Sequence, residues 1–427
     1  MENTVQKLKN YLDNSPSQYH AVENIKQMLI AAGYTQLSES EQWQLEQGKG
    51  YFVIRGGSAL MAFRIPEGTP SGFIMSAAHS DRPTFKVKEN GELVGTYTRL
   101  ATERYGGSLI STWLDRPLSI AGRVMVETQD GMESRLVNID KDLLLIPNVA
   151  IHMNRKANEG YTWNPAVDTL PLVGGKEAAG KLQALLEEAA GGKILSHDLY
   201  LYLRQAASIW GVEEAFISAQ GIDDLACVFG CAQGFLNAKP GNNIPVLCVF
   251  DAEEVGSATV QGADSTFLEN VLNRICYSCD WDLECLLSQS FMISADNGHA
   301  IHPNHPEYAD ATNAPVVNGG VTLKFNAAQK YTTDGISAGI FKTVCKKAGV
   351  KVQTYYNRAD LPGGSTLGNI SLSHISVPTA DIGLPQLAMH SVMETAGVKD
   401  VEDLVSAMAV FYESTLENSG NGTYRIK

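Results

Sequence analysis

Five short segments of the 427-residue sequence carry histidine and carboxylate side chains that could bind metal ions or transfer protons. In chain order they are Ala78-His79-Ser80-Asp81-Arg82-Pro83, Gly221-Ile222-Asp223-Asp224-Leu225, Asp251-Ala252-Glu253-Glu254-Val255-Gly256, Ser294-Ala295-Asp296-Asn297 and Leu387-Ala388-Met389-His390-Ser391. Each segment alone has an ordinary explanation, such as a helix-capping aspartate or a solvated loop. Together they supply donors for two divalent cations that share one carboxylate, and they leave one glutamate as a base beside a bridging water.

The expected positions of these segments favour a shared site. Apolar runs at 73–78, 244–250 and 291–294 predict buried strands, and one of the segments follows each run. Because open α/β folds bind ligands at the carboxyl ends of their strands, we expect the segments to meet at one edge. Asp81 can orient the ring of His79. Glu253 and Glu254 repel each other, which a sheet edge tolerates only with a cation nearby or with full exposure to solvent.

The surrounding pattern predicts one interrupted α/β domain. Helical spacing and strand-type runs predict helices at 5–12, 21–32, 223–238, 334–348 and 401–416, and further strands at 51–54, 59–65, 352–356 and 379–382. Between about residues 87 and 217 the pattern changes to shorter polar strands, turns and a helix at 176–189. This change indicates an insertion into the α/β domain.

Composition restricts the classes of protein that fit. Apolar residues make up 44% of the chain, enough for a large core. With 33 basic and 47 acidic residues the net charge is −14, which disfavours nucleic acid and anionic membranes as partners. No run approaches the roughly 20 apolar residues of a membrane-spanning helix. The N-terminus lacks the basic start and apolar segment of a signal peptide, and seven scattered cysteines fit reduced thiols, so we expect a cytoplasmic protein.

Three other patterns suggest different chemistry, but each lacks a required part. Residues 175–181 match the start of a phosphate-binding loop, yet Leu182 stands where a serine or threonine must bind Mg²⁺. Cys276, Cys279 and Cys285 begin like a zinc knuckle without a fourth spaced ligand. A run of three histidines from 299 to 305 contains Pro303 and is followed by Pro306, and these prolines prevent one helix from presenting all three. The functional prediction therefore rests on the five segments.

The five segments resemble those of the aspartyl aminopeptidase family of dinuclear metallopeptidases. The resemblance extends over nearly the whole chain and includes Phe85-Lys86-Val87-Lys88, Tyr105-Gly106-Gly107, Trp113-Leu114-Asp115-Arg116 and His302-Pro303-Asn304. The family often has asparagine where this chain has Asp224 and Ala252. Neither position is a metal ligand in the family pattern, so these departures leave the metal site intact.

The resemblance implies a fold and a set of roles. The fold is α/β: a mixed-sheet metallopeptidase domain with helices on both faces (residues 1–87 and 218–427), interrupted by an inserted β-rich dimerisation domain (residues 88–217). His79 and Asp296 would hold one metal, Glu254 and His390 would hold the other, and Asp223 would bridge them. Glu253 would take a proton from the bridging water, and Asp81 would orient His79.

Two more residues gain a role only through the resemblance. In the family, the histidine that matches His152 crosses the dimer interface and hydrogen-bonds the scissile carbonyl oxygen. The lysine that matches Lys324 lies near the substrate side chain in members that prefer acidic first residues, whereas other members prefer neutral ones. Family dimers assemble into a hollow dodecamer, so we expect this chain to self-associate.

The expected activity is that of a metallo-aminopeptidase, which hydrolyses the first peptide bond of short peptides with a free N-terminus. Two divalent ions per subunit are expected, with Zn²⁺ first and Co²⁺ or Mn²⁺ as alternatives. A deacylase or carboxypeptidase acting on acylamino acids would use the same metal pair. A non-catalytic scaffold stapled by metals is the alternative from another class, and Glu253 argues against it, because a staple has no use for an unligated glutamate.

Overall fold

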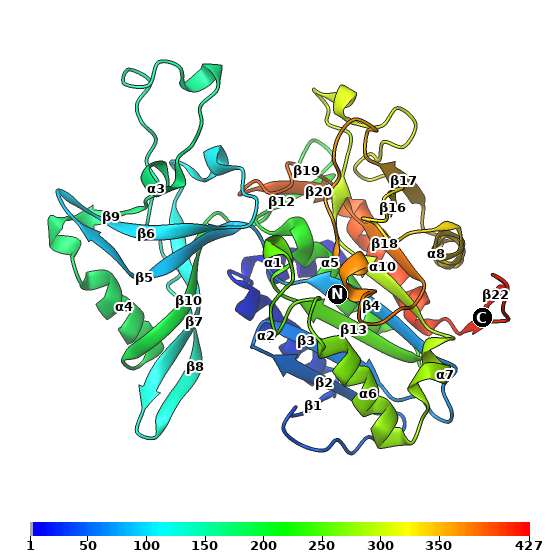
Figure 1. Cartoon of the computed structure of the whole chain (residues 1–427). Coiled ribbons are helices and arrows are strands. Elements are labelled where there is room, and N and C mark those ends of the chain that lie inside the picture. Colours follow the sequence, from blue (N-terminus) through cyan, green and yellow to red (C-terminus); the bar gives the residue numbers. More distant parts are fainter. Residues whose placement is uncertain (1–2) are drawn as a thin grey trace.

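The computed structural model describes residues 3–427 and contains two bodies of unequal size (Figure 1). The larger body is built on a nine-stranded sheet, and the smaller is a six-stranded sheet set to one side of it. In spatial order the nine strands are β1 (Thr35–Gln36), β2 (Gly50–Arg55), β3 (Ala59–Arg64), β13 (Ile244–Phe250), β4 (Phe73–His79), β14 (Phe291–Ala295), β18 (Thr379–Gly383), β16 (Val321–Phe325) and β17 (Val352–Tyr356).

The central strands of the nine-stranded sheet end at one edge. β13, β4, β14 and β18 run parallel, whereas β3 and β16 run antiparallel to their central neighbours, so the sheet is mixed as expected. His79, the last residue of β4, is paired in register with Phe250, the last residue of β13. Because these two strands end at the same level of the sheet, the segments that follow them lie at the same edge. The predicted strands at 73–78, 244–250 and 291–294 agree with β4, β13 and β14 to within one residue.

Alternating side chains of the central strands enter two separate cores, one on each face of the sheet. In β4, Ile74 and Ala78 belong to one core, and Met75 and Ala77 belong to the other. Helices of the first core are α1 (Thr4–Asp13), α2 (Gln18–Ala31), α5 (Ile222–Asn237), α8 (Gly335–Ala348) and α10 (Val398–Glu413), and those of the second are α6 (Phe267–Cys279), α7 (Leu283–Leu287) and α9 (Leu367–Ser371). Because both faces are buried, the strands are continuous apolar runs rather than alternating ones.

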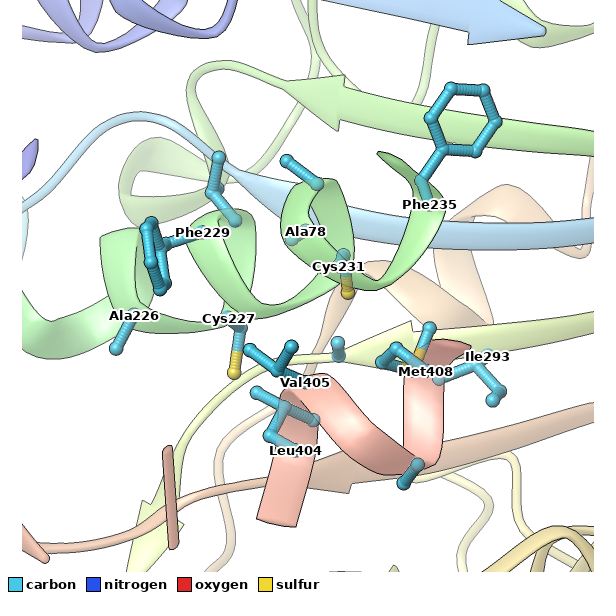
Figure 2. Close-up of a cluster of buried hydrophobic side chains, with 14 of the residues drawn as sticks. Ala78, Ala226, Cys227, Phe229, Cys231, Phe235, Ile293, Leu404, Val405 and Met408 are labelled. Atoms are coloured by element: carbon cyan, nitrogen blue, oxygen red, sulfur yellow. The ribbon is translucent and has the colours of Figure 1, made fainter. Parts of the chain in front are cut away.

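Helix α5, which has the acidic pair Asp223 and Asp224 in its first turn, packs closely on α10 (Figure 2). Gly230 and Gly234 face α10, and a Cβ atom added at either glycine would collide with Leu404 or Met408. Figure 2 also shows Cys227 pointing from α5 toward α10. Burial of each large apolar side chain in such an interface contributes about 1.5–3 kcal/mol to folding. The close packing fixes α5, and with it the acidic pair at its start.

The smaller body has its own core. Its strands, in spatial order, are β8 (Gly131–Asn138), β7 (Leu118–Thr128), β10 (Ile194–Leu203), β5 (Thr84–Val94), β6 (Tyr97–Tyr105) and β9 (Leu172–Gly175). Helix α4 (Lys181–Ala190) packs Leu182 and Leu186 into the core of this sheet. The predicted helix at 176–189 is wrong at its start, because Gly180 has a φ of 73° that is incompatible with a helix, and residues 176–178 form only a 3-10 turn.

A third sheet joins segments that are far apart in the sequence. Its strands, in spatial order, are β11 (Ser208–Trp210), β12 (Phe216–Ala219), β20 (Glu394–Gly397), β19 (Pro385–Leu387) and β15 (Gly298–His299). Because β12 leads into α5 and pairs with β20, this sheet brings the loop between β19 and β20 to the start of α5. The remaining elements are α3 (Pro165–Asp168), β21 (Leu416–Asn418) and β22 (Tyr424–Ile426). Within residues 3–427, no helix is long and apolar enough to cross a membrane.

Candidate active site

The structure brings the five predicted metal ligands together at the carboxyl edge of the nine-stranded sheet. His79 ends β4, and Asp296 directly follows β14. Asp223 lies in the first turn of α5, Glu254 lies in a 3-10 turn after β13, and His390 lies in the loop between β19 and β20. The site therefore depends on strand ends of one sheet, a helix start and a loop of the third sheet.

The donor atoms of these residues form overlapping groups. Nε2 of His79 lies 3.5 Å from Oδ1 of Asp223, and Nε2 of His390 lies 3.5 Å from Oδ2 of the same carboxylate. Two groups with donors within 4.8 Å of one another are His79, Asp223, Asp224 and Asp296, and Asp223, Glu254 and His390. Asp223 belongs to both groups. A carboxylate with one oxygen toward each group suits a position between two cations.

Two buried oxygens of the proposed metal ligands lack a hydrogen-bond donor. Oδ1 of Asp223 and Oε1 of Glu254 accept no hydrogen bond from any residue in the described part of the chain. A buried carboxylate oxygen without a donor is costly unless a cation takes the place of the donor. Imidazole and carboxylate are donors that zinc binds in proteins, so the residues present fit zinc. A third group with this spacing, His79, Glu253 and Glu254, lies in the same site, and across residues 3–427 no such group includes the three-histidine run or the three nearby cysteines.

Burial shifts the pKa values of the acids in the site. It raises the pKa of Glu253 to about 7 and that of Asp296 to about 6, because the carboxylates lose hydration and repel one another. Burial acts in the same direction on Asp223, but its contacts with the imidazoles of His390 and His79 outweigh this effect and hold its pKa below the usual range. The site therefore contains an excess of buried negative charge, which divalent cations would neutralise.

Asp81 makes more contacts than the sequence predicted. Its backbone oxygen and its Oδ1 both lie 3.2 Å from Nδ1 of His79, so it can orient the ring. Its carboxylate also accepts hydrogen bonds from the backbone N–H groups of Glu253 and Glu254, both at 3.1 Å. The hydroxyl of Tyr105, from β6 of the smaller body, donates to the same carboxylate at 2.8 Å. Asp81 thus positions both the ring of His79 and the turn that carries Glu253 and Glu254, hereafter the glutamate turn.

Asp224 is a buried site residue whose side chain the sequence did not assign. Its Oδ2 accepts a hydrogen bond from the backbone N–H of His79 at 3.2 Å. Burial raises the pKa of Asp224 well above its usual value, so this carboxyl favours the neutral form. A neutral carboxyl resembles the amide of asparagine in shape and charge. The departure from the family pattern at this position is therefore chemically small.

Lys324 is almost fully buried, with 1% of its surface exposed, and it lies beside Asp296. Its ammonium donates hydrogen bonds to the backbone oxygens of Asp296 at 2.6 Å and Asn297 at 3.3 Å. It also lies 3.7 Å from the Asp296 carboxylate and 5.1 Å from the centre of the Tyr331 ring. Lys324 therefore supports the backbone at a predicted ligand as well as facing the cavity.

A cavity of ≈ 320 Å³ opens onto these residues. Its lining includes His79, Asp223, Glu253, Asp296 and Lys324. A neighbouring cavity of ≈ 370 Å³ shares His299 and Met389 with it. The two cavities together offer space for a residue and part of the peptide that follows it.

His152 is the one predicted catalytic residue that a single chain does not bring to the site. It lies in an exposed turn on the long connection between β8 and α3, and it does not line the cavity. In Figure 1 this connection protrudes from the smaller body. Val149, Ile151 and Met153 beside it are 50%, 47% and 79% exposed, which is unusual for large apolar side chains.

Comparison with known proteins agrees with this geometry. Residues 11–412 match the family model for aminopeptidase I zinc metalloprotease (M18). The probable M18 family aminopeptidase 2 of Clostridium novyi is 43% identical over 409 residues, covering 92% of this chain and 94% of the relative. The protein of the same name from Pseudomonas aeruginosa is 39% identical over 423 residues, covering 96% and 98%.

Solved structures of similar fold include several aminopeptidases. A chain in the structure of the Ape4 and Nbr1 complex has a TM-score of 0.92 and 34% identity, covering 96% of this chain and 85% of that chain. A dodecamer of mApe1 from S. cerevisiae has a TM-score of 0.85 and 26% identity, covering 96% of both chains. The M18 aminopeptidase of Thermotoga maritima, at 22% identity and a TM-score of 0.86, supports the fold alone. The chain therefore belongs to the aminopeptidase I zinc metalloprotease (M18) family, a family of peptide hydrolases.

Proposed function

We propose that the protein removes the N-terminal residue from short peptides, with His79, Asp296, Glu254, His390 and the bridging Asp223 holding two zinc ions. The observation that carries this proposal is that two groups of ligand atoms share Asp223, which lines a cavity together with His79, Asp296 and His390. Bound zinc would polarise the scissile carbonyl group and lower the pKa of the attacking water. Glu253 lines the cavity beside these ligands and belongs to neither group that shares Asp223, so we assign its carboxylate the role of moving a proton from the water to the leaving amine.

The amino group of the substrate distinguishes an aminopeptidase from the alternatives that use the same metal pair. An aminopeptidase needs a free amine on the substrate, whereas a deacylase or carboxypeptidase acts on a blocked one. We expect the zinc-loaded protein to hydrolyse aminoacyl-p-nitroanilides and to leave N-acetyl amino acids intact. The reverse preference would establish a deacylase, and the absence of hydrolysis across a broad peptide library would establish a metal-stapled scaffold. The M18 membership favours the first result.

Removal of zinc is expected to destabilise the fold, because the buried carboxylates then repel one another without compensation. A ligand at 100 times its Kd stabilises the folded state by about 2.7 kcal/mol. We therefore expect a chelator to lower the thermal unfolding midpoint and added zinc to restore it, with two zinc ions per subunit by elemental analysis. His390→Ala is the matched control, since it should show a smaller chelator effect. An unchanged midpoint in the wild-type protein would contradict the proposed ligand set.

Lys324 is proposed to favour acidic first residues, because its ammonium faces the cavity and would pair with a substrate carboxylate. We expect Lys324→Ala to lower the rate for aspartyl substrates relative to leucyl substrates by about tenfold or more. Lys330→Ala is the control, since this exposed lysine bonds only a backbone oxygen, that of Gly363. Zinc content is measured in parallel, because Lys324 also supports Asp296. An unchanged ratio of the two rates would mean that Lys324 serves only as that support.

Self-association is proposed through the inserted segment, residues 88–217, as dimers that assemble into a dodecamer. The dodecameric structure of the S. cerevisiae relative supports oligomer assembly. The exposed apolar residues around His152 supply a surface that a partner subunit would cover. We also propose a cytoplasmic location, with which the seven free cysteines are compatible.

A further inference from the structure

The buried carboxylate of Glu394 connects the two proposed ligands that come from outside the central strands. Glu394 is the first residue of β20 and is 1% exposed. Its Oε2 accepts a hydrogen bond from the backbone N–H of Asp223 at 2.9 Å, and its Oε1 accepts one from the backbone N–H of His390 at 2.7 Å. Each oxygen therefore holds a different ligand-bearing segment.

The connection continues to a third ligand-bearing segment through two amide side chains. Nε2 of Gln386 lies 3.5 Å from Oε1 of Glu394, and Oε1 of Gln386 accepts a hydrogen bond from Nδ2 of Asn297 at 3.0 Å. Asn297 follows the proposed ligand Asp296 and donates from the same Nδ2 to the backbone oxygen of Ile222 at 2.8 Å. Glu394, Gln386 and Asn297 are hereafter called the clamp.

The backbone at His390 requires such support. His390 has a φ of 66°, in the left-handed region that residues other than glycine rarely adopt. Ala388, two residues earlier, has a φ of 56°. A loop in this conformation keeps its geometry only when neighbouring groups fix it. Two hydrogen bonds hold the backbone of the left-handed residue itself: its N–H donates to Glu394, and its carbonyl oxygen accepts from the N–H of Leu109 at 2.9 Å.

We propose that the clamp sets the spacing of the zinc ligands, so that zinc affinity depends on three side chains that are not ligands themselves. The inference rests on the proposed function, because it takes Asp223, His390 and Asp296 as ligands. The clamp fixes the backbone at the first two through Glu394 and reaches the third through Asn297. Residues that orient metal ligands typically contribute about 10–100-fold to metal affinity. The clamp residues are therefore positioning residues rather than catalytic ones.

Glu394→Gln gives the sharpest test, because it keeps the size and shape of the side chain. An amide has one oxygen, so its NH₂ group must face one of the two backbone N–H donors, and that hydrogen bond is lost. We expect zinc affinity, measured by competition with a fluorescent chelator, to fall about 10–100-fold. The absorption spectrum of the Co²⁺-loaded variant should also differ from that of the wild type. Gln386→Met, which removes the middle of the clamp without adding charge, should weaken zinc binding in the same direction and provides the test if Glu394→Gln does not fold.

Asp400→Asn is the matched control. Asp400 is also fully buried, and its carboxylate also accepts two backbone N–H bonds, from Asn318 at 2.5 Å and Gly320 at 2.8 Å, but neither donor belongs to a proposed ligand. We expect Asp400→Asn to lower the unfolding midpoint and to leave zinc affinity unchanged. If Glu394→Gln and Gln386→Met bind zinc as tightly as the wild type, the clamp proposal is wrong while the proposed function stands. If the wild-type protein binds no zinc, the proposed function itself is wrong.

Discussion

Glu253→Gln is expected to retain zinc and to lose turnover by about 10²–10⁴-fold, the usual cost of removing a general base. Glutamine fills the same space but cannot take a proton from water. The turn should survive the change, because Asp81 holds Glu253 through its backbone N–H group rather than through its side chain. The measurement combines elemental analysis for zinc with kcat/KM on an aminoacyl-p-nitroanilide.

The neighbouring Glu254→Gln variant is the matched control for this result. Glu254 shares a group of donor atoms with Asp223 and His390, so its replacement should lower zinc content as well as activity. The structure also contains a third group of close donors, formed by His79, Glu253 and Glu254. Loss of zinc from Glu253→Gln would therefore identify Glu253 as a ligand from that group and would remove it from the role of base.

The central part of the fold could be predicted because its local sequence is unambiguous. Strands β4 and β13 are buried on both faces, so each is a largely apolar run, with Ser76 as the polar residue inside β4, that ends at a polar segment. Once parallel strands are assumed, the segments after them must meet at one edge, and this brought His79, Glu254 and Asp296 together. Helix α6 was not predicted, although its buried residues Phe267, Val271, Leu272 and Ile275 recur at helical spacing.

The supporting contacts of the site had no local signal. Glu394 lies in a short strand, and nothing in its sequence neighbourhood indicates that its carboxylate bonds the backbone of Asp223, 171 residues away. The bonds that Asp81 accepts from Glu253 and Glu254 likewise span 172 and 173 residues. Such contacts depend on the final packing of distant segments. Patterns in a single sequence indicate only local structure, namely individual helices and strands. The sequence thus placed the proposed ligands at one edge and predicted Asp81 as the residue that orients His79, but it did not indicate the contacts of Glu394 or those of Asp81 with the glutamate turn.

His152→Ala is expected to lower kcat by about 10²–10³-fold, the usual cost of losing a hydrogen-bond donor to the developing oxyanion. The single chain places His152 in an exposed turn and outside the cavity, so this role requires that the side chain act in the site of a partner subunit. His197→Ala is the control within the inserted segment, since His197 lies near Glu89 of its own chain and should not affect catalysis. Normal activity of His152→Ala would remove the residue from the mechanism.

Subunit mixing separates action in the partner's site from action in the same chain. His152→Ala and Glu253→Ala, each inactive alone, are unfolded together in equal amounts and reassembled. If His152 acts in the partner subunit, each mixed dimer contains one site with an intact Glu253 and an intact histidine from the other chain. With random pairing in a two-fold dimer, half of the dimers are mixed, so activity should return to roughly one quarter of the wild-type level. If His152 acts within its own chain, every site lacks one of the two groups, and the mixture stays as inactive as the separate variants.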